Sequence, residues 1–230
     1  METSTIEVLN LRQLSDTVTE RYKNFVVETV NNSCLRMSVN HGLYDWHVHD
    51  NSDELFIVLE GELQVELPDS QVFKLKPLDF LKMPKGTVHR TSSETRTVNL
   101  VYESMDMNTQ FLTRIDNKKV TGKFLVKNLK KTGRSIEDDY KNFVLEEIND
   151  DVLRLGVNHG IYDWHCHPNS DELFLGIENT VQIEFEDMDS ITFEPLEIVK
   201  ITRGFLHRTI APERKVSVTF ESRLTETVNL

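Results

Sequence analysis

The chain has 230 residues, enough for one large or two small domains. Its 38 acidic side chains against 26 basic ones give a net charge of −12, and such a surface repels nucleic-acid phosphates and anionic lipid. We therefore expect neither nucleic acid nor a membrane as a partner, and no segment is apolar and long enough to span a bilayer.

Two further features bear on the cellular compartment. Residues 1–8 contain neither a basic region nor an apolar run, so we expect no signal peptide. Cys34 and Cys166 stand at positions that do not correspond in the internal repeat described below, which favours free thiols over a disulfide framework. We predict a cytoplasmic protein.

Short segments with strand character follow one another along the first half of the chain. A strand at 6–9 and a helical turn near 10–17 are followed by a hairpin, because residues 25–40 are apolar or alternating on both sides of an Asn-Asn-Ser turn. Further strands are expected at 54–59, 62–67, 71–75, 80–83 and 98–103. Short strands with closely spaced turns, and no long amphipathic helix, predict an all-β sandwich or barrel.

One stretch occurs twice. YDWHVHDNSDELF at 44–56 returns as YDWHCHPNSDELF at 162–174, a shift of 118 residues (162 − 44). The correspondence runs without a gap from Tyr22 to Ser104 and includes all 8 histidines, four in each copy. Such repetition predicts two similar domains. We expect a domain at 1–104, a linker at 105–121 with no partner in the repeat, and a second domain at 122–230.

Each copy contains a set of metal-ligand types. His47 and His49 point to one side of a strand, because side chains alternate across a pleat. Glu54 opens the next strand after a polar turn, and His89 follows a turn at 84–86. Three neutral imidazoles and one carboxylate suit a divalent transition metal and leave room for water or a substrate. The second copy repeats the set with the same spacing: His165, His167, Glu172 and His207.

These motifs resemble those of the cupin superfamily. Its first motif, a glycine, His-x-His, a spaced Glu and a closing glycine, is matched by Gly42, His47, His49, Glu54 and Gly61. Its second motif, Pro-x-Gly-x-x-His, is matched by Pro84, Gly86 and His89. The resemblance covers nearly the whole chain as two tandem domains, a bicupin. It implies that each copy is a double-stranded β-helix, a small jelly roll, with the four ligands named above around one metal.

The second copy departs from the two motifs at two places. Gly61 becomes Asn179, which tolerates a left-handed backbone, and Pro84 becomes Thr202. All ligand types survive, so metal binding is expected in both copies. Two larger changes, Val58 to Gly176 and Thr87 to Phe205, predict that the two cavities differ in shape.

Several other residues are duplicated 118 positions on, and their roles stay open at this point. His41 either has a structural role or orients a metal ligand. Arg36 either holds a substrate carboxylate at the barrel mouth or is an exposed charge. Trp46 is expected to pack away from the metal. Alternation places Thr91 on the ligand side of its strand and Arg90 outside.

Three His and one Glu leave one or two positions open on a five- or six-coordinate ion. This favours an oxidoreductase, most simply an Fe(II) or Mn(II) dioxygenase acting on a small organic molecule, with the metal as Lewis acid. The alternatives are a metal-dependent isomerase or lyase and a non-catalytic small-ligand binding protein. Nickel, copper or zinc would also bind such donors. The sequence identifies no catalytic residue, and we expect either a monomer with domains related by a pseudo-twofold axis or a homodimer.

Overall fold

The structure is a computed structural model that describes residues 6–115, 120 and 122–230. Its contacts group the chain into two compact units. The N-terminal unit is Ser15–Asn128, and the C-terminal unit is Leu129–Leu230 together with the segment that ends at Leu14. None of the helices in these described parts is long and apolar enough to cross a membrane.

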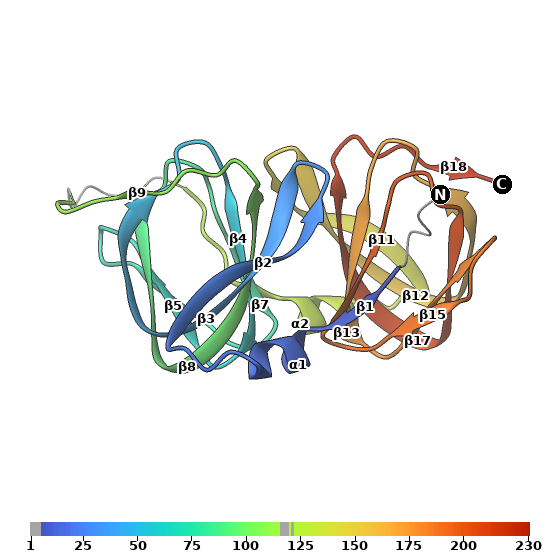
Figure 1. Ribbon diagram of the computed structural model, residues 1–230, viewed down its shortest axis with the longest axis horizontal. Coiled ribbons are helices and arrows are strands. Elements are labelled where there is room, and N and C mark those ends of the chain that lie inside the picture. The colour runs from blue at the N-terminus through green and yellow to red at the C-terminus, as the bar shows by residue number, and fades with distance from the viewer. Residues whose placement is uncertain (1–5, 116–119, 121) are drawn as a thin grey trace. The chain divides into compact units, whose positions relative to one another are not determined.

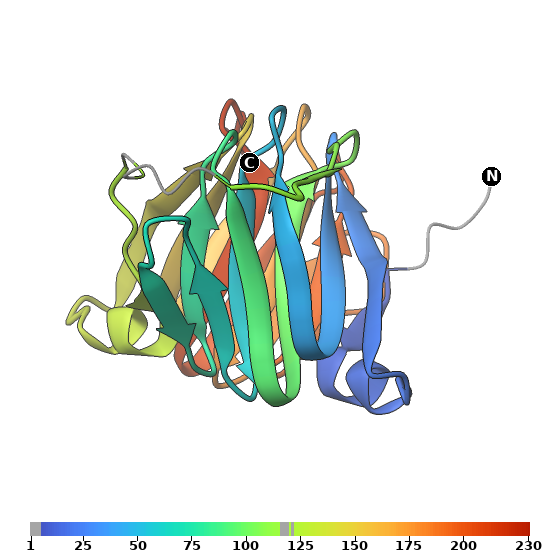
Figure 2. The same cartoon turned by 90° about the vertical axis from the view of Figure 1, so that its left-hand side faces the viewer.

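The N-terminal unit is one antiparallel nine-stranded sheet that curves round on itself (Figure 2). Its strands are β2 (Tyr22–Val30), β3 (Ser33–Val48), β4 (Glu54–Glu60), β5 (Leu63–Glu66), β6 (Val72–Leu75), β7 (Asp79–Met83), β8 (His89–Ser104), β9 (Gln110–Phe111) and β10 (Lys127–Asn128). The order is β10-β7-β4-β8-β3-β2, with β5 on β8, β6 on β5 and β9 on β3. The strand pattern expected from the sequence is confirmed in this unit.

The C-terminal unit repeats this sheet strand by strand (Figure 1). Its elements are β1 (Val8–Asn10), α2 (Leu129–Arg134), β11 (Tyr140–Ile148), β12 (Asp151–Cys166), β13 (Glu172–Glu178), β14 (Val181–Phe185), β15 (Ile191–Phe193), β16 (Glu197–Ile201), β17 (His207–Ser222) and β18 (Val228–Asn229). The order is β1-β16-β13-β17-β12-β11. Helix α1 (Leu11–Asp16) spans the division between the units. The all-β prediction is therefore confirmed for the whole described chain.

The alternating strands supply the core of each unit. In β5, Leu63 and Val65 are buried while Gln64 and Glu66 are half-buried on the other face. The buried cluster of the N-terminal unit consists of Phe56, Val58, Leu63, Val65, Leu67, Leu75, Leu81, Met83 and Val101. The equivalent cluster in the C-terminal unit includes Phe174, Val181, Ile183, Phe185, Phe193, Val199 and Ile201. Burial of these side chains, each worth about 1.5–3 kcal/mol, holds the strands that carry the site.

A register shift precedes the first candidate ligand, and a left-handed backbone position recurs in both units. The pairing of β3 with β8 shifts register between Tyr44 and His47, directly before the first histidine, and such bulges re-aim side chains. Gly61 has a φ of +79°, and a Cβ there would lie 2.5 Å from Oγ1 of Thr97. Asn179 adopts a φ of 59° at the equivalent position, as its tolerance of the left-handed region predicts.

The opening strands of the two copies are exchanged. β1 pairs with β16 of the C-terminal unit, and β10 pairs with β7 of the N-terminal unit. The contacts thus divide the chain near residues 14 and 128, whereas the repeat predicts domains at 1–104 and 122–230. Those boundaries stay a prediction, since a compact unit and a duplicated unit need not coincide.

The segment after β8 has no counterpart in the sequence repeat, but part of it has one in the fold. β9 pairs with β3 beside His47, and β18 pairs with β12 beside His165 in the same register. The two segments share few residue types, so their equivalence is structural and does not show in the sequence. Residues 116–119 and 121 of the expected linker lie outside the described residues.

Candidate metal centres

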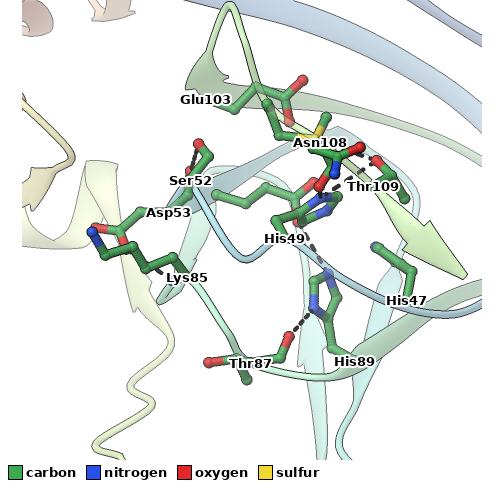
Figure 3. Close-up of polar contacts among 12 residues, drawn as sticks. His47, His49, Ser52, Asp53, Lys85, Thr87, His89, Glu103, Asn108 and Thr109 are labelled. Carbon is green, nitrogen blue, oxygen red and sulfur yellow. Dashed lines mark hydrogen bonds and ion pairs between the residues drawn. The ribbon is translucent and has the colours of Figure 1, made fainter. Parts of the chain in front are cut away.

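Three strands bring the first candidate cluster together. His47 lies near the end of β3, with His49 just beyond it; Glu54 opens β4, and His89 opens β8 directly opposite His47. One ligand atom from each of the four lies within 4.8 Å of the others, and all four residues are buried. Figure 3 shows the three histidines of this cluster. The structure thus assembles the four residues that the spacing singled out.

Each imidazole of this cluster is oriented by a backbone carbonyl. Nδ1 of His47 donates to the carbonyl of Asp45 at 2.7 Å, and Nδ1 of His89 to that of Thr87 at 3.0 Å. Nδ1 of His49 lies 3.3 Å from the carbonyl of Asn108 (Figure 3). Because a carbonyl only accepts, Nδ1 carries a proton in each ring, and Nε2 is the nitrogen that faces Glu54 and can bind a metal when it is deprotonated. This is the tautomer that a metal ligand needs.

The second cluster is built in the same way. His165, His167, Glu172 and His207 are buried, and their ligand atoms also lie within 4.8 Å of one another. Nδ1 of His165 donates to the Asp163 carbonyl at 2.8 Å, and Nδ1 of His207 to that of Phe205 at 3.1 Å. Nδ1 of His167 donates to the carbonyl of Glu226 at 3.0 Å. The duplication therefore extends from the residue types to the hydrogen bonds behind them.

The atoms that face one another in each cluster call for a cation. Oε2 of Glu172 and Nε2 of His207 are buried without a hydrogen-bond partner, 3.4 Å apart. Donors bound at about 2.1 Å to one ion lie at most about 4.2 Å from one another, close to the observed spread. A divalent metal held by the three Nε2 atoms and the carboxylate would satisfy every one of these groups. The donor set therefore fits a metal.

The charges of the clusters agree with this arrangement. Burial opposes the ionisation of Glu54, but hydrogen bonds from His49 and His89 outweigh it and hold its pKa well below the ordinary value. Burial lowers the pKa of His47 to about 4, so this ring is neutral at pH 7. Burial disfavours the cation of His167 too, yet its bond to Glu172 raises its pKa to about 9. A metal that binds His167 would therefore have to displace a proton from this ring at neutral pH.

A second buried carboxylate, which sequence reasoning did not single out, lies near each cluster. Glu103 lines the cavity beside the first, and burial, followed by the charge of Glu54, raises its pKa to about 8. Its partner is Arg36, with Nε 3.6 Å away. In the C-terminal unit, Nε of Arg154 hydrogen-bonds Glu221. Both arginines line a cavity, as a role in binding a substrate carboxylate would require. Each, however, already has a carboxylate of this chain beside it.

Other duplicated residues stand outside the clusters. The guanidinium of Arg90 lies over the Trp46 ring at 4.6 Å, and that of Arg208 over Trp164 at 4.8 Å. Thr91 lines its cavity, so the expected alternation is confirmed. His41 is exposed. The ligand histidines are oriented by the backbone carbonyls described above, and not by His41. These carbonyls belong to the main chain and could not be recognised from residue type.

A cavity adjoins each cluster, and the two differ as predicted but for another reason. The cavity of the N-terminal unit measures about 560 Å³ and that of the C-terminal unit about 300 Å³. Neither Gly176 nor Phe205 lines the smaller one. A Cβ on Gly176 would lie 2.3 Å from the Glu194 carbonyl oxygen, because the turn before β16 covers it. The prediction that these two residues shape the cavity was wrong.

Comparison with known proteins accounts for this geometry. The family model described as "Cupin domain" matches residues 36–102. The protein "Uncharacterized protein YdbB" of Bacillus subtilis (strain 168) is 52% identical over 94 residues, which cover 41% of this chain and 83% of that protein. This chain belongs to the cupin superfamily. The resemblance seen in the two motifs is thereby confirmed.

Solved structures match this cupin along its whole length. A cupin 2 conserved barrel domain protein from Leptotrichia buccalis aligns with a TM-score of 0.74 at 10% identity, covering 96% of this chain and 98% of that one. Salicylate 1,2-dioxygenase from Pseudaminobacter salicylatoxidans aligns at 0.77 and 8%, covering 100% and 89%. The coconut allergen cocosin aligns at 0.66 and 10%, covering 99% and 88%. At such identities the likeness shows a bicupin fold and nothing about activity.

Proposed function

We propose that this bicupin is a metal-dependent oxidoreductase of the dioxygenase type that acts on a small organic molecule. The observation that carries the proposal is the inward convergence of three Nε2 lone pairs and one carboxylate beside a cavity of about 560 Å³, a size typical of small-molecule sites. The fold shared with salicylate 1,2-dioxygenase supports it at the level of architecture.

The roles of the chain's own residues follow from the geometry. His47, His49, Glu54 and His89 would hold a divalent metal in the N-terminal unit, and His165, His167, Glu172 and His207 would do so in the other. When bound, such a metal supplies a Lewis acid that polarises and orients the substrate. The cavity walls supply apolar contact through Leu43 and Val101 and hydrogen bonding through Thr91.

A second candidate, isomerase or lyase chemistry, is favoured by Glu103. This carboxyl lines the cavity, and its raised pKa of about 8 keeps much of it protonated near neutral pH. A group with a pKa near the working pH is suited to proton transfer. Replacement of Glu103 by Gln would then lower turnover by about 10²- to 10⁴-fold. A dioxygenase that needs no protein acid would lose much less.

Anaerobic purification followed by metal analysis tests the proposal. The full chain, loaded in turn with Fe(II) and Mn(II), is then screened with small acids and phenols in an oxygen electrode. Oxygen uptake that depends on the metal and on one compound class supports a dioxygenase. Conversion without oxygen uptake supports the second candidate. A compound that binds tightly and is recovered unchanged would contradict both and indicate a binding protein.

The metal and the assembly are part of the same proposal. We favour iron or manganese, and nickel, copper or zinc from the medium would bind the same donors, since affinity follows the Irving–Williams order. We expect a small molecule as the partner. We expect neither nucleic acid nor a membrane, because the net charge of −12 repels phosphate groups and anionic lipid. Light scattering distinguishes the monomer from the homodimer.

A further inference from the structure

The two cavities differ most at one asparagine of the repeat. In the N-terminal unit, both side-chain polar atoms of Asn40 form hydrogen bonds with neighbouring side chains. Its Nδ2 donates to Oδ1 of Asn99 at 2.9 Å, and its Oδ1 accepts from Oγ of Ser93 at 2.6 Å. Thr97, directly opposite on β8, turns its hydroxyl to the Glu62 carbonyl at 3.2 Å and does not line the cavity. The polar groups at this place satisfy one another without a ligand.

The C-terminal unit keeps the asparagine and loses both of its partners. Asn158 corresponds to Asn40, while Asn99 is replaced by Ser217 and Ser93 by Ala211 (each 118 residues on). As a result, Nδ2 of Asn158 is buried without a hydrogen-bond partner, and the residue is only 5% exposed. An unmade hydrogen bond of this kind is costly and calls for a partner.

A buried cation stands beside this amide. Lys215 replaces Thr97, pairs directly with Asn158 across β12 and β17, and lines the same cavity. It is 3% exposed, and its ammonium donates to Oγ of Ser217 at 3.1 Å, a neutral group. Burial lowers the pKa of Lys215 to about 8, which Glu172 partly opposes. Buried charges are as a rule paired. Among the described residues no carboxylate lies at ion-pair distance from this ammonium, so it can accept the negative charge of a ligand.

The acidic groups of the same cavity are committed elsewhere. Glu221 hydrogen-bonds Nε of Arg154, and Glu172 faces the histidines of the metal cluster. Two further wall positions are polar in this unit and apolar in the other, since Thr219 corresponds to Val101 and Thr225 to Met107. Among the described residues, Lys215 is the buried cation of this cavity that has no carboxylate partner. Together with the unpartnered N–H of Asn158 and the two added threonines, it matches a ligand with one negative charge.

We propose that the cavity of the C-terminal unit binds a small organic monocarboxylate, with one oxygen on the Lys215 ammonium and the other on the Asn158 amide. The cavity of about 300 Å³ lies at the lower end of the range for small-molecule sites. The N-terminal cavity, with Asn40 satisfied and threonine in place of lysine, has no such anchor. The two barrels therefore take chemically different ligands.

This inference deepens the proposed function, and it rests on that function only for its link to catalysis.

Binding is measured by calorimetry under argon with benzoate, its neutral analogue benzamide and inorganic phosphate. The full chain is used both metal-free and loaded with redox-inactive Zn²⁺. We expect one benzoate site per chain and a preference over benzamide of at least about 10-fold in both forms. Two equivalent sites, no preference, or tighter binding of phosphate would overturn the proposal.

Two variants locate the anchor. Lys215→Met removes the charge at similar volume and should weaken benzoate about 10- to 100-fold while leaving benzamide within about twofold. The double variant Ala211→Ser, Ser217→Asn restores the partners that Asn40 has, and it should weaken benzoate without removing any charge. Thermal melting shows that both variants are folded. The same change at an exposed lysine of this unit that does not line the cavity, Lys131→Met, is the control and should alter benzoate binding by less than about twofold.

The outcomes separate the two proposals. If Lys215→Met binds benzoate as tightly as the parent protein, the inference fails whether or not the protein consumes oxygen. If benzoate binding depends on Lys215 in the metal-free form, yet no compound supports oxygen uptake, the anion site stands and the dioxygenase proposal fails.

Discussion

Nε2 of His89 lies 3.0 Å from Oε2 of Glu54, although Nδ1 of the same ring already donates to the Thr87 carbonyl. With Nδ1 protonated, Nε2 can face the carboxylate in two ways: it carries a second proton, which makes the ring a cation, or it binds a metal ion that takes the place of that proton. In either case a positive charge lies between the ring and the carboxylate. The same relation holds for His207 and Glu172 at 3.4 Å.

Replacing one glutamate should therefore remove one metal. Glu54→Gln and Glu172→Gln each exchange an anionic ligand for a neutral amide, and we expect affinity at that site to fall by more than about 100-fold, since even residues behind the ligands cost 10- to 100-fold. Metal analysis should give two ions per chain in the parent protein, one in either variant and none in the double variant.

The histidines outside the clusters provide the control. His41→Ala and His159→Ala remove the other ligand type of the clusters from exposed positions of the same repeat. Both variants should keep two metals. Loss of a metal from either one, or retention of both in Glu54→Gln, would contradict the assignment of the ligands.

Acid should release the metals, beginning with the C-terminal site. A metal competes with protons for Nε2, and the ring with the highest pKa in the metal-free protein is protonated first. His167 has a pKa of about 9, raised by Glu172 against the effect of burial, so its proton competes already at neutral pH. His47 and His165, at about 4, stay neutral until far lower. Dialysis against a chelator at stepwise lower pH should show stoichiometric loss between about pH 7 and 5. Equal metal content at pH 7.5 and pH 4.5 would contradict this.

Glu103 should make the metal-free protein less stable as the pH rises. Its pKa is about 8 in the folded chain against an ordinary 4.5, because burial and the charge of Glu54 disfavour ionisation. The stability that the protonated carboxyl contributes is complete below about 4.5 and is lost as the pH rises to about 8, by at most about 1.4 kcal/mol for each pH unit. Glu103→Gln should flatten this dependence in urea unfolding at pH 5 and pH 8.

An exposed glutamate of the same strand serves as the comparison. Glu94→Gln leaves the buried carboxyl in place and should show the pH dependence of the parent protein. If both variants behave alike, Glu103 is already ionised in the folded chain and the proton-transfer candidate loses its support.

Gly176 should tolerate no side chain. A Cβ there would lie 2.3 Å from the Glu194 carbonyl oxygen, so the backbone of the covering turn must move. We expect Gly176→Ala to cost about 1–3 kcal/mol, as overpacking of a core does. Gly156→Ala, in the same unit, places its Cβ 3.7 Å from the nearest atom and should be close to neutral. Thermal unfolding of the two variants side by side measures the difference.

The sequence predicted the fold and the two clusters because both depend on side-chain pattern. Alternation gave the strands, and the duplicated spacing singled out residues such as His47 and Glu54. The carbonyls of Asn108 and Glu226, which orient one histidine in each unit, belong to the main chain, so no residue type marks them. For the same reason β9 and β18 were not recognised as equivalents.

Features that depend on register could not be predicted either. Lys215 is one lysine among many in the sequence, and only its pairing with Asn158 shows that it stands in a cavity. Gly176 lies four residues after Glu172, a spacing that puts both on one face of a regular strand. The sheet, however, shifts register between Gly176 and Glu178, and a turn covers the glycine. Irregular positions of this kind follow from tertiary packing.

The exchange of β1 and β10 affects how the chain can be cut. A fragment that ends at residue 104 would include β1, which pairs with β16 of the other unit. It would lack β10, which pairs with β7 at the edge of its own sheet. A severed half therefore leaves one sheet edge bare and prone to aggregation. Excision at 15 and 128, which keeps every strand with its neighbours, is the dissection that should yield a soluble single barrel.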